Sequence, residues 1–381
     1  MPPLRLPNPA WLRSRRSFFV SPTLTPIHDP RRWPPGRPSP TTAPSAGLRA
    51  VAAEPAARLS VWTFNLRTSF CEEQDGDDGW SHRRSGVARL LQRHRPAVVA
   101  AQEATLPMIE YLVEQTGYEW HGQCRSGDHS DEHSALLWDP ARLRLLQGET
   151  RWLAPRPESA GIGWDAAFNR IYTRGLFELC DSPSATQLVI VCTHFDHVGT
   201  VARVRSAEAL RRLLQPGDSD AWDVSATTPT ILCGDFNSVK LPLAEGAGAP
   251  GPFAALTEGH GGWKDAWALA AQRELNGLAP SASTIHKFRG LAFEDGFGDG
   301  TVTFSAREAD TPDGAQHIDW ILVAEPEDHP VRLRPMTAAV ITEALETGRF
   351  PSDHFPVAVE FSVVAQEEKS ILGKAMMMLG M

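Results

Sequence analysis

The chain has 381 residues, of which 42% are hydrophobic, and a formal net charge of −9. This composition is typical of a globular protein with a large core, and no apolar run approaches the length that spans a bilayer, which excludes an integral membrane segment. Residues 1–58 carry nine arginines and two acidic residues, so residues 59–381 have a formal charge of −16. A body this acidic disfavours tight, sequence-independent binding of nucleic acid.

Residues 1–58 are rich in Pro and Ser and lack apolar periodicity, so we expect them to be disordered. Their Arg-rich beginning resembles an organellar transit peptide, although its prolines oppose the amphipathic helix of such a signal. A tail without a targeting role is the alternative. Five cysteines form no Cys-x-x-Cys pair, and Cys192 and Cys233 lie in apolar runs as small core residues. This usage favours a reducing, intracellular compartment, mitochondrial or cytoplasmic.

From residue 59 onward, apolar periodicity predicts strands and helices. The elements expected in the first half are a strand at 59–64, an acidic loop at 71–81, a helix at 82–94, a buried strand at 97–102, a helix at 105–113, and a hairpin-like pair of strands at 134–138 and 143–146.

The second half continues with more strands than helices. It is expected to contain strands at 171–179, 187–195 and 229–233, a helix at 201–214, a surface loop at 241–262, a helix at 267–274, strands at 318–323 and 356–364, and a tail at 365–381. About ten strands and few helices predict an α/β sandwich, in which helices cover two packed sheets. We expect residues 59–364 to form one catalytic domain.

Five predicted strands end or begin at polar side chains that suit a metal or phosphate site. Each would be unremarkable alone, but together they supply the groups needed for metal-assisted hydrolysis of a phosphoester. The residues are Asn65, Glu103, His194, Asp235 with Asn237 in Gly234-Asp235-Phe236-Asn237, and Asp353 with His354.

The chemistry of each residue predicts its role. Mg²⁺ prefers oxygen ligands, so Glu103 is the best candidate ligand and Asn65 can add an amide oxygen. Asp235 and Asn237 are two residues apart, which places both side chains on one face of an extended segment. Such a pair can take the proton of a water molecule and fix its position. The same tetrapeptide could instead be an ordinary turn.

Two histidines complete the predicted site. His354 needs a partner that fixes its tautomer, and Asp319 interrupts an otherwise apolar strand, so the two are expected to pair. His194 is placed to bind the phosphoryl group or assist the leaving oxygen. A core histidine that is satisfied by the backbone is the alternative for either imidazole.

These residues, in this order, resemble the motifs of the endonuclease/exonuclease/phosphatase superfamily, which has the fold of type I deoxyribonucleases. The resemblance covers residues 59–364 and implies a four-layer α/β sandwich with two mostly antiparallel sheets. It implies Mg²⁺ or Mn²⁺ bound by Glu103, with help from Asn65 and Asp353. It also implies an oriented His354–Asp319 pair, and leaves open whether His354 or Asp235 accepts the proton of the water.

A narrower resemblance is to a branch of microbial and fungal members with a His-x-Asp-His-x-Gly motif, here Thr193-His194-Phe195-Asp196-His197-Val198-Gly199. The branch typically has Leu where Phe195 stands and Pro where Asn169 stands. Arg170 is expected to bind phosphate with its planar guanidinium. Three further residues are expected either to shape the substrate pocket or to brace the His194 loop through ion pairs: Asp196, His197 and Arg203.

The leading hypothesis is a Mg²⁺-dependent phosphoesterase that acts as a monomer on a phosphorylated small molecule, a lipid head group or a short nucleic acid. A true nuclease that cleaves DNA or RNA is one alternative, but Arg67 stands where abasic-site endonucleases carry Asp. The other alternative is a catalytically silent binding module. No predicted catalytic position is occupied by an inert residue such as Ala or Leu, which opposes that alternative.

Overall fold

The computed structural model describes residues 57–182, 185–212, 228–240, 250–259, 262–293, 313–326 and 329–365. All these residues belong to one unit that comprises Ala53–Met381. The predictions for the N-terminal segment and for the tail concern residues that lie almost entirely outside the described ranges. No helix in the part of the chain described here is long and apolar enough to cross a bilayer.

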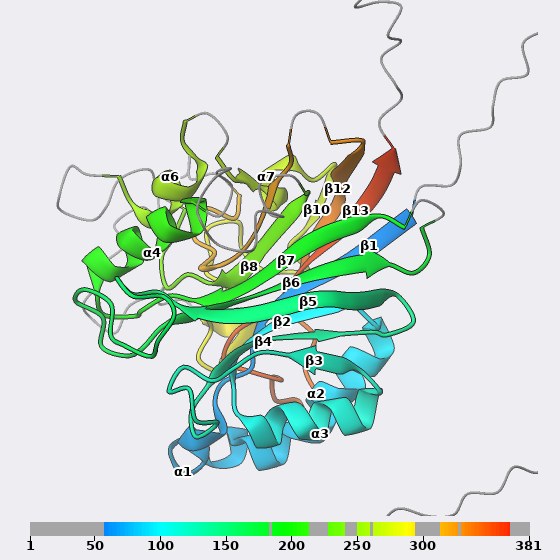
Figure 1. The fold of residues 1–381 in the computed structure, drawn as a ribbon. Helices are drawn as coiled ribbons and strands as arrows, with labels where there is room; N and C mark the ends of the chain where they lie inside the picture. Colours follow the sequence, from blue (N-terminus) through cyan, green and yellow to red (C-terminus); the bar gives the residue numbers. More distant parts are fainter. Residues whose placement is uncertain are drawn as a thin grey trace, which may run out of the picture. The chain divides into compact units, whose positions relative to one another are not determined.

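Two mixed sheets form the centre of this unit (Figure 1). The first sheet has seven strands in the order β10-β12-β13-β1-β2-β4-β3. Four of its six strand pairings are antiparallel. Its strands are β10 (Gln272–Glu274), β12 (Val331–Val340), β13 (Val357–Ala365), β1 (Ala57–Asn65), β2 (Val98–Ala104), β4 (His133–Trp138) and β3 (Glu119–His121).

The second sheet has six strands in the order β5-β6-β7-β8-β11-β9. Its only parallel pairing among the described strands joins β7 to β8. The strands are β5 (Leu143–Trp152), β6 (Ile171–Leu179), β7 (Gln187–His194), β8 (Thr230–Asp235), β11 (Asp319–Ala324) and β9 (Lys264–Asp265).

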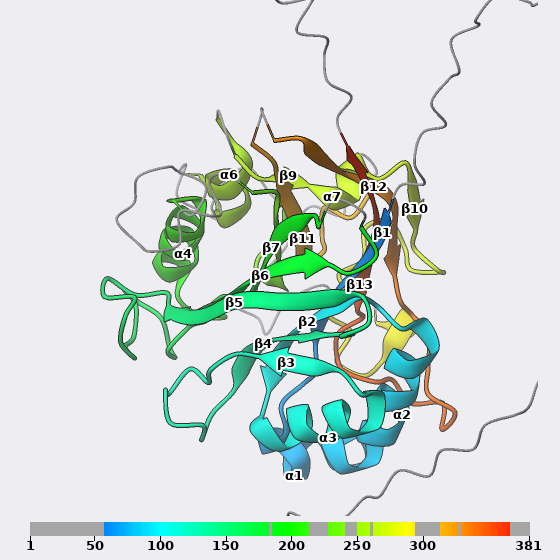
Figure 2. The same ribbon diagram turned by 45° about the vertical axis from the view of Figure 1, so that its right-hand side comes forward.

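Helices cover the outer faces of both sheets, so the predicted four-layer α/β sandwich is confirmed (Figure 2). The helices α2 (Trp80–His94) and α3 (Leu106–Thr116) pack on the first sheet, and α4 (Thr200–Arg212) and α6 (Pro252–Thr257) pack on the second. Shorter helical segments are η1 (Ser69–Cys71), α1 (Glu72–Asp75), η2 (Gly76–Asp78), α7 (Ala266–Leu269) and η3 (Gly290–Ala292).

Alternating side chains separate the layers. On β2, Val98 and Ala100 face the other sheet, whereas Val99 and Ala101 face α2 and α3. Both faces of a central strand are therefore buried, which explains its continuous apolar sequence. Cys192 and Cys233 are fully buried between the sheets, as predicted.

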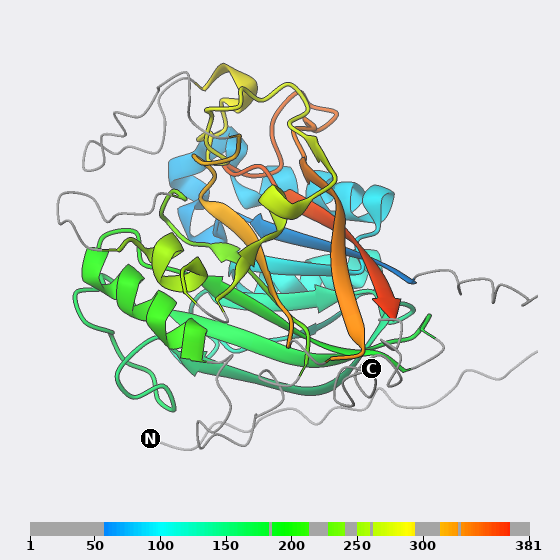
Figure 3. The same cartoon turned by 90° about the horizontal axis from the view of Figure 1, so that it is seen from above.

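The strand β13 lies between β12 and β1 and joins the two ends of the described chain. Its register pairs Val363 with Ala57 and Val357 with Thr63. Figure 3 shows β1 (blue) beside β13 (red) when the molecule is seen from above. The alternating residues of β13 face the other sheet, as the period of two in its sequence predicts.

Four predictions of local structure are wrong in whole or in part. The segments at 134–138 and 143–146 do not form a hairpin, because β4 and β5 belong to different sheets. The segment at 267–274 is helical only in α7 and then pairs with β12 as the strand β10. The loops at 71–81 and 241–262 contain the short helices α1 and α6, and residues 241–249 lie outside the described ranges.

The strands β3, β9 and β12 were missed altogether, and β12 is the longest of them. The strand β12 contains Arg332, Arg334 and Pro335, which read as loop residues because Pro cannot donate to a sheet. A shift in register at Pro335–Thr337 accommodates the proline. On the opposite edge, β10 pairs only with residues 337–339. Only residues 337–339 of β12 therefore pair with a strand on each side, and Pro335, which lacks a backbone N–H, lies outside that stretch.

Candidate active site

Three neighbouring strands of the second sheet place polar side chains in one row. His194 ends β7 and is the register partner of Asp235, which ends β8. Asp235 is in turn the partner of Asp319, which begins β11. The antiparallel direction of β11 explains why its first residue meets the last residues of the other two strands. The sheet register alone therefore brings three predicted residues together.

The first sheet contributes its own strand ends to the same place. Asn65, at the end of β1, donates through Nδ2 to Glu103 Oε1 and to Asp235 Oδ2, each at 2.9 Å. This amide therefore links the carboxylates of both sheets. Its Oδ1 accepts from Arg67 N at 2.9 Å, so in this arrangement Asn65 orients the two carboxylates. Ser352 Oγ holds the Asn65 carbonyl at 2.7 Å and ties the Asp353-His354 segment to β1.

The predicted imidazole–carboxylate pair is present. His354 Nδ1 lies 3.0 Å from Asp319 Oδ2, and Thr284 Oγ1 donates to the same oxygen at 2.6 Å. Because a carboxylate oxygen can only accept, His354 Nδ1 carries the proton, which fixes the orientation of the ring. The free nitrogen, Nε2, lies 3.8 Å from Asp235 Oδ2.

Burial and mutual charge strongly shift the acid–base properties of this group. Burial, together with the charge of Asp319, raises the pKa of Asp235 to about 7. Burial disfavours the charged form of His354, but Asp319 and Asp235 outweigh it and raise the pKa of this imidazole to about 10. The imidazole of His354 is therefore cationic near neutral pH, while Asp235 is poised to exchange a proton.

His194 and Asn237 form the other wall of the site. Asn237 N donates to Asp235 Oδ1 at 2.9 Å, and its Nδ2 donates to Phe195 O and lies 3.0 Å from His194 Nε2. Burial and the charges of nearby arginines lower the pKa of His194 well below its usual value, so this ring is neutral and Nε2 can accept. His194 Nε2 lies 3.5 Å from Asp235 Oδ2.

Three residues at or just beyond the strand ends of the site have a strained backbone. Arg67, Glu103 and Asn237 have φ values of 54°, 56° and 45°, in the left-handed region that non-glycine residues rarely adopt. Such conformations persist where the surrounding structure imposes them, and they are frequent at functional sites. Here they direct Glu103 and Asn237 out of their strands toward the shared site.

Oxygen atoms from four carboxylates are available to a hard cation. Glu103 accepts from Asn65 Nδ2 and from Thr68 N, and although burial opposes its charge, these bonds lower the pKa of Glu103. Burial and repulsion by Glu103 raise the pKa of Asp353, a strain that a bound cation relieves. Atoms of Asp235, Asp319 and His354 also lie within 4.8 Å of one another.

The donor set fits Mg²⁺ or Mn²⁺ better at Glu103 and Asp353 than at the Asp235–Asp319–His354 cluster. In that cluster the hydrogen-bonding capacity of Asp319 Oδ2 is already used by Thr284 and His354. Asp319 Oδ1 has no hydrogen-bond partner among the described residues, but the cationic imidazole of His354 would repel a metal ion bound in that cluster. Glu103 and Asp353 present only oxygen atoms and border the polar end of β1.

An acidic segment stands beside the site. Arg67 donates from Nε and Nη2 to both oxygens of Asp75 at 2.9 Å, and its Nε lies 3.9 Å from Asp353 Oδ2. The helix α1 is thereby held next to the carboxylates of the site. Asp75 and the acidic segment at 72–78 therefore lie near Asp353.

The residues of the His-x-Asp-His-x-Gly motif form a buried network next to His194. Asp196 accepts from the backbone amides of Phe168, Val198 and Gly199 and from Arg170 Nε at 3.2 Å. Arg170 Nη2 lies 3.1 Å from His197 Nδ1, and Arg203 donates to the Asp196 carbonyl. This geometry supports the bracing role among the two predicted alternatives, and contact with substrate stays a prediction.

Two residues that support the site were not predicted from the sequence. Thr284 supports Asp319 but lies in a Ser/Thr-rich loop that has no periodic signal. Arg83 is 1% exposed, although it lies on a helix among other charged residues. Its spacing to Val87, Leu90 and Leu91 places it on the apolar face of α2, which was the signal available. Its guanidinium donates to the carbonyls of Leu66, Arg67, Asp78 and Pro351.

Replacing Arg83 by Met is expected to lower the free energy of unfolding by about 4 kcal/mol, because several buried carbonyls lose their donor. Urea unfolding of the two proteins measures the difference. Arg89→Met is the matched control, since Arg89 on the same helix is largely exposed and its ion pair with Glu346 is 3.6 Å long. A loss no larger than that of Arg89→Met would contradict a structural role for the Arg83 guanidinium.

Because His286 is buried, we expect the folded protein to lose stability at acidic pH. Burial, and then the positive charge of His354, lower the pKa of His286 to about 3. Between this value and the usual 6.5, the unfolded chain binds a proton that the folded protein does not, so stability falls as the pH decreases. The free energy of unfolding of the metal-free protein is expected to fall between pH 7.5 and pH 4.5. We expect His286→Phe to make this fall smaller by about 2.5 kcal/mol. Urea unfolding at both pH values measures it, and an unchanged pH dependence would exclude His286 as the cause.

Comparisons with known proteins identify a family and several similar structures. The model of the endonuclease/exonuclease/phosphatase family matches residues 62–354. A family protein from Bacteroides thetaiotaomicron is 25% identical, with a TM-score of 0.63 over 82% of this chain and 99% of that one. A mannosyl-6-phosphatase from the same organism is 26% identical, with a TM-score of 0.60 over 80% and 99%.

A more distant structure shares the fold alone. The D. rerio protein TDP2, solved with a single-strand DNA product, is 17% identical, with a TM-score of 0.53 over 80% of this chain and 99% of that one. A search of the curated proteins gave no match.

Proposed function

The chain belongs to the endonuclease/exonuclease/phosphatase family, whose members are generally phosphoester hydrolases, and from this premise we propose that it is a Mg²⁺- or Mn²⁺-dependent phosphoesterase acting on a phosphorylated small molecule. The observation that carries this proposal is the position of Asp235 Oδ2. It lies 2.9 Å from Asn65 Nδ2, 3.5 Å from His194 Nε2 and 3.8 Å from His354 Nε2. A single carboxylate is thus surrounded by groups that can position water and phosphate.

The charge and hydrogen-bonding capacity of each residue determine its proposed catalytic role. The imidazole of His354, kept cationic by Asp319, binds a phosphoryl oxygen. Asp235 accepts the proton of the attacking water, because a pKa of about 7 suits a general base near neutral pH. Asn237 holds that water in line, and neutral His194 faces the oxygen that leaves.

Glu103, supported by Asp353 and Asn65, would hold the divalent cation. A cation bound there supplies neutralisation of the phosphoryl charge. Asn65 contributes by fixing the distance between the carboxylates of Glu103 and Asp235, since its one amide group bonds to both. This arrangement connects the cation-binding residues to the residue that accepts the proton.

A small substrate is favoured over a nucleic-acid duplex. The acidic helix α1 is fixed beside the site by the Arg67–Asp75 pair, and a nearby run of phosphates would be repelled. The similarity to a mannosyl-6-phosphatase also supports a phosphorylated small molecule as the substrate.

The test is a screen of phosphate release and diester cleavage with Mg²⁺, Mn²⁺ or EDTA. Hexose phosphates, nucleotides, inositol phosphates, sphingomyelin and plasmid DNA represent the substrate classes. We expect turnover of a small phosphoester that EDTA abolishes and Mg²⁺ restores. Activity confined to DNA, with a steep dependence on salt, would instead identify a nuclease. Absence of metal-dependent turnover in the whole screen would refute the proposal.

A further inference from the structure

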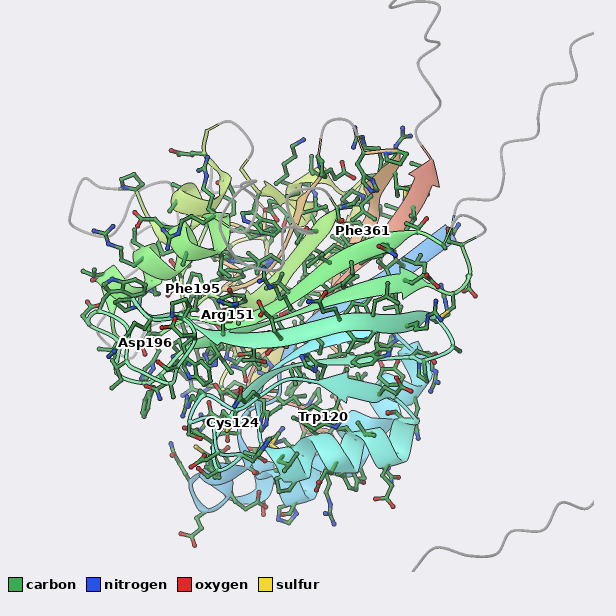
Figure 4. All side chains as sticks on the ribbon, in the orientation of Figure 1. Trp120, Cys124, Arg151, Phe195, Asp196 and Phe361 are labelled. Atoms are coloured by element: carbon green, nitrogen blue, oxygen red, sulfur yellow. The ribbon has the colours of Figure 1, made fainter. Side chains whose placement is uncertain are left out.

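A small recess adjoins the site on the side of His194. It is lined by Arg125, Glu132, His133, Asn169, Arg170 and His194, together with neighbouring backbone. Two loops form it: the loop bounded by the Cys124–His133 bridge and the loop that precedes β6. Figure 4 labels Cys124 and Asp196, which mark this end of the sheets. Asn169 Nδ2 donates to the Arg125 carbonyl at 3.2 Å and holds the two loops together.

The recess presents both donors and acceptors. Arg125 donates from Nη1 to Glu132 Oε2 and from Nε to Asp131 Oδ1, each at 2.8 Å. His133 Nδ1 lies 3.0 Å from the Ala104 carbonyl, which can only accept, so Nδ1 carries a proton. Burial lowers the pKa of His133 and keeps the ring neutral. Its Nε2 is therefore an acceptor.

His133 Nε2 has no hydrogen-bond partner among the residues that the structure describes, although the side chain is only 1% exposed. A buried acceptor without a donor is unfavourable by about 1–3 kcal/mol. A group that donates a hydrogen bond, such as a hydroxyl group or water, would satisfy it.

Size and charge restrict what the recess can take. The space that the centre of a water molecule can occupy in it is about 10 Å³. This is room for about one water or one hydroxyl group. The charge of Arg125 is balanced by Glu132 and Asp131, and that of Arg170 by Asp196. A second phosphate would meet the Glu132 carboxylate without a surplus of positive charge. A neutral hydroxyl group meets both a donor and an acceptor.

We propose that this recess binds a hydroxyl group of the alcohol portion of the substrate, so that the enzyme acts on phosphate monoesters of polyols, and that Glu132 and Asn169 determine this preference. The proposal rests on the proposed phosphoesterase function and specifies its substrate class. A hydroxyl group in this recess lies next to His194, so the phosphate that the same alcohol carries lies close to Asp235 and His354.

The experiment compares esters that differ only in hydroxyl groups. One pair is an aldohexopyranose 6-phosphate and tetrahydropyran-2-ylmethyl phosphate, and the other is glycerol 3-phosphate and propyl phosphate, each assayed with Mg²⁺. For at least one pair, the wild-type protein is expected to have a kcat/KM about tenfold or more higher for the hydroxylated ester. In Glu132→Gln and Asn169→Ala, this ratio is expected to fall by about tenfold.

Glu114→Gln is the matched control, because Glu114 is exposed on α3, and it is expected to keep the wild-type ratio. A wild-type ratio near one in both pairs would overturn the proposal without any variant, and so would a ratio that both variants retain. Either result would assign the recess to an ordered water only. If neither ester of either pair is hydrolysed, and the wider screen is also negative, the phosphoesterase function itself fails.

Discussion

Asp235→Asn is expected to lower kcat by about a thousandfold while leaving the fold intact. The carboxylate would lose its ability to accept a proton, and general-base catalysis contributes about 10²–10⁴-fold in enzymes. The amide has nearly the same shape, and its single oxygen can still accept from Asn237 N, whereas the bond that Asn65 Nδ2 donates to Asp235 Oδ2 is lost. The measurement is steady-state hydrolysis of the best ester from the screen, at saturating Mg²⁺.

A measurement of the melting temperature distinguishes a loss of catalysis from a loss of folding. Asp235 is 1% exposed and lies opposite Asp319 in the strand register, and both its burial and that neighbour raise its pKa. Removing the charge relieves the repulsion with Asp319 and offsets the lost bond from Asn65, so the melting temperature of Asp235→Asn is expected to stay close to that of the wild type. Asp181→Asn, at an exposed position, is the matched control for both measurements. Unchanged turnover in Asp235→Asn would exclude Asp235 as the base.

Glu103→Gln is expected to raise the Mg²⁺ concentration for half-maximal activity by about a hundredfold. An amide lacks the negative charge that a hard cation requires from its main ligand. The substitution also weakens the acceptor of Thr68 N, although the hydrogen bond itself can remain. Activity measured against Mg²⁺ concentration, together with calorimetric titration of the free protein, reports the affinity directly.

The control for Glu103→Gln is Glu110→Gln, which removes a carboxylate from the exposed face of α3. It is expected to leave the Mg²⁺ dependence unchanged. If Glu103→Gln lowers kcat but binds Mg²⁺ with wild-type affinity, the cation is held elsewhere. The Asp235–Asp319–His354 cluster would then be the site to test next.

The sequence predicted those parts of the fold whose signal is local. Strands such as β2 and β8 are continuous apolar runs, and the polar residues at their ends could be recognised because a strand directs them to one edge. Partners in space were harder to predict. The strands β4 and β5 are adjacent in the chain, and no pattern of residues shows that the chain crosses between sheets there.

Individual side chains were predictable where their chemistry required a partner. The pairing of His354 with Asp319 could be inferred, because a carboxylate in an apolar strand calls for compensation. Arg83 could not be assigned in this way, since its acceptors are backbone carbonyls from three separate segments. Backbone carbonyls are present in every sequence, so only the folded chain shows which of them converge.

The pairing of the first described strand with the last has a consequence for biosynthesis. Ala57 and Val363 are register partners about 300 residues apart, and the Asp353-His354 segment precedes the strand that closes the sheet. While β13 is still inside the ribosome, β1 has an unpaired edge and the site lacks His354. Contacts of such long separation form slowly, and an open strand edge invites association with other chains. The nascent protein is therefore expected to stay inactive and prone to aggregation until β13 has left the ribosome and paired with β1.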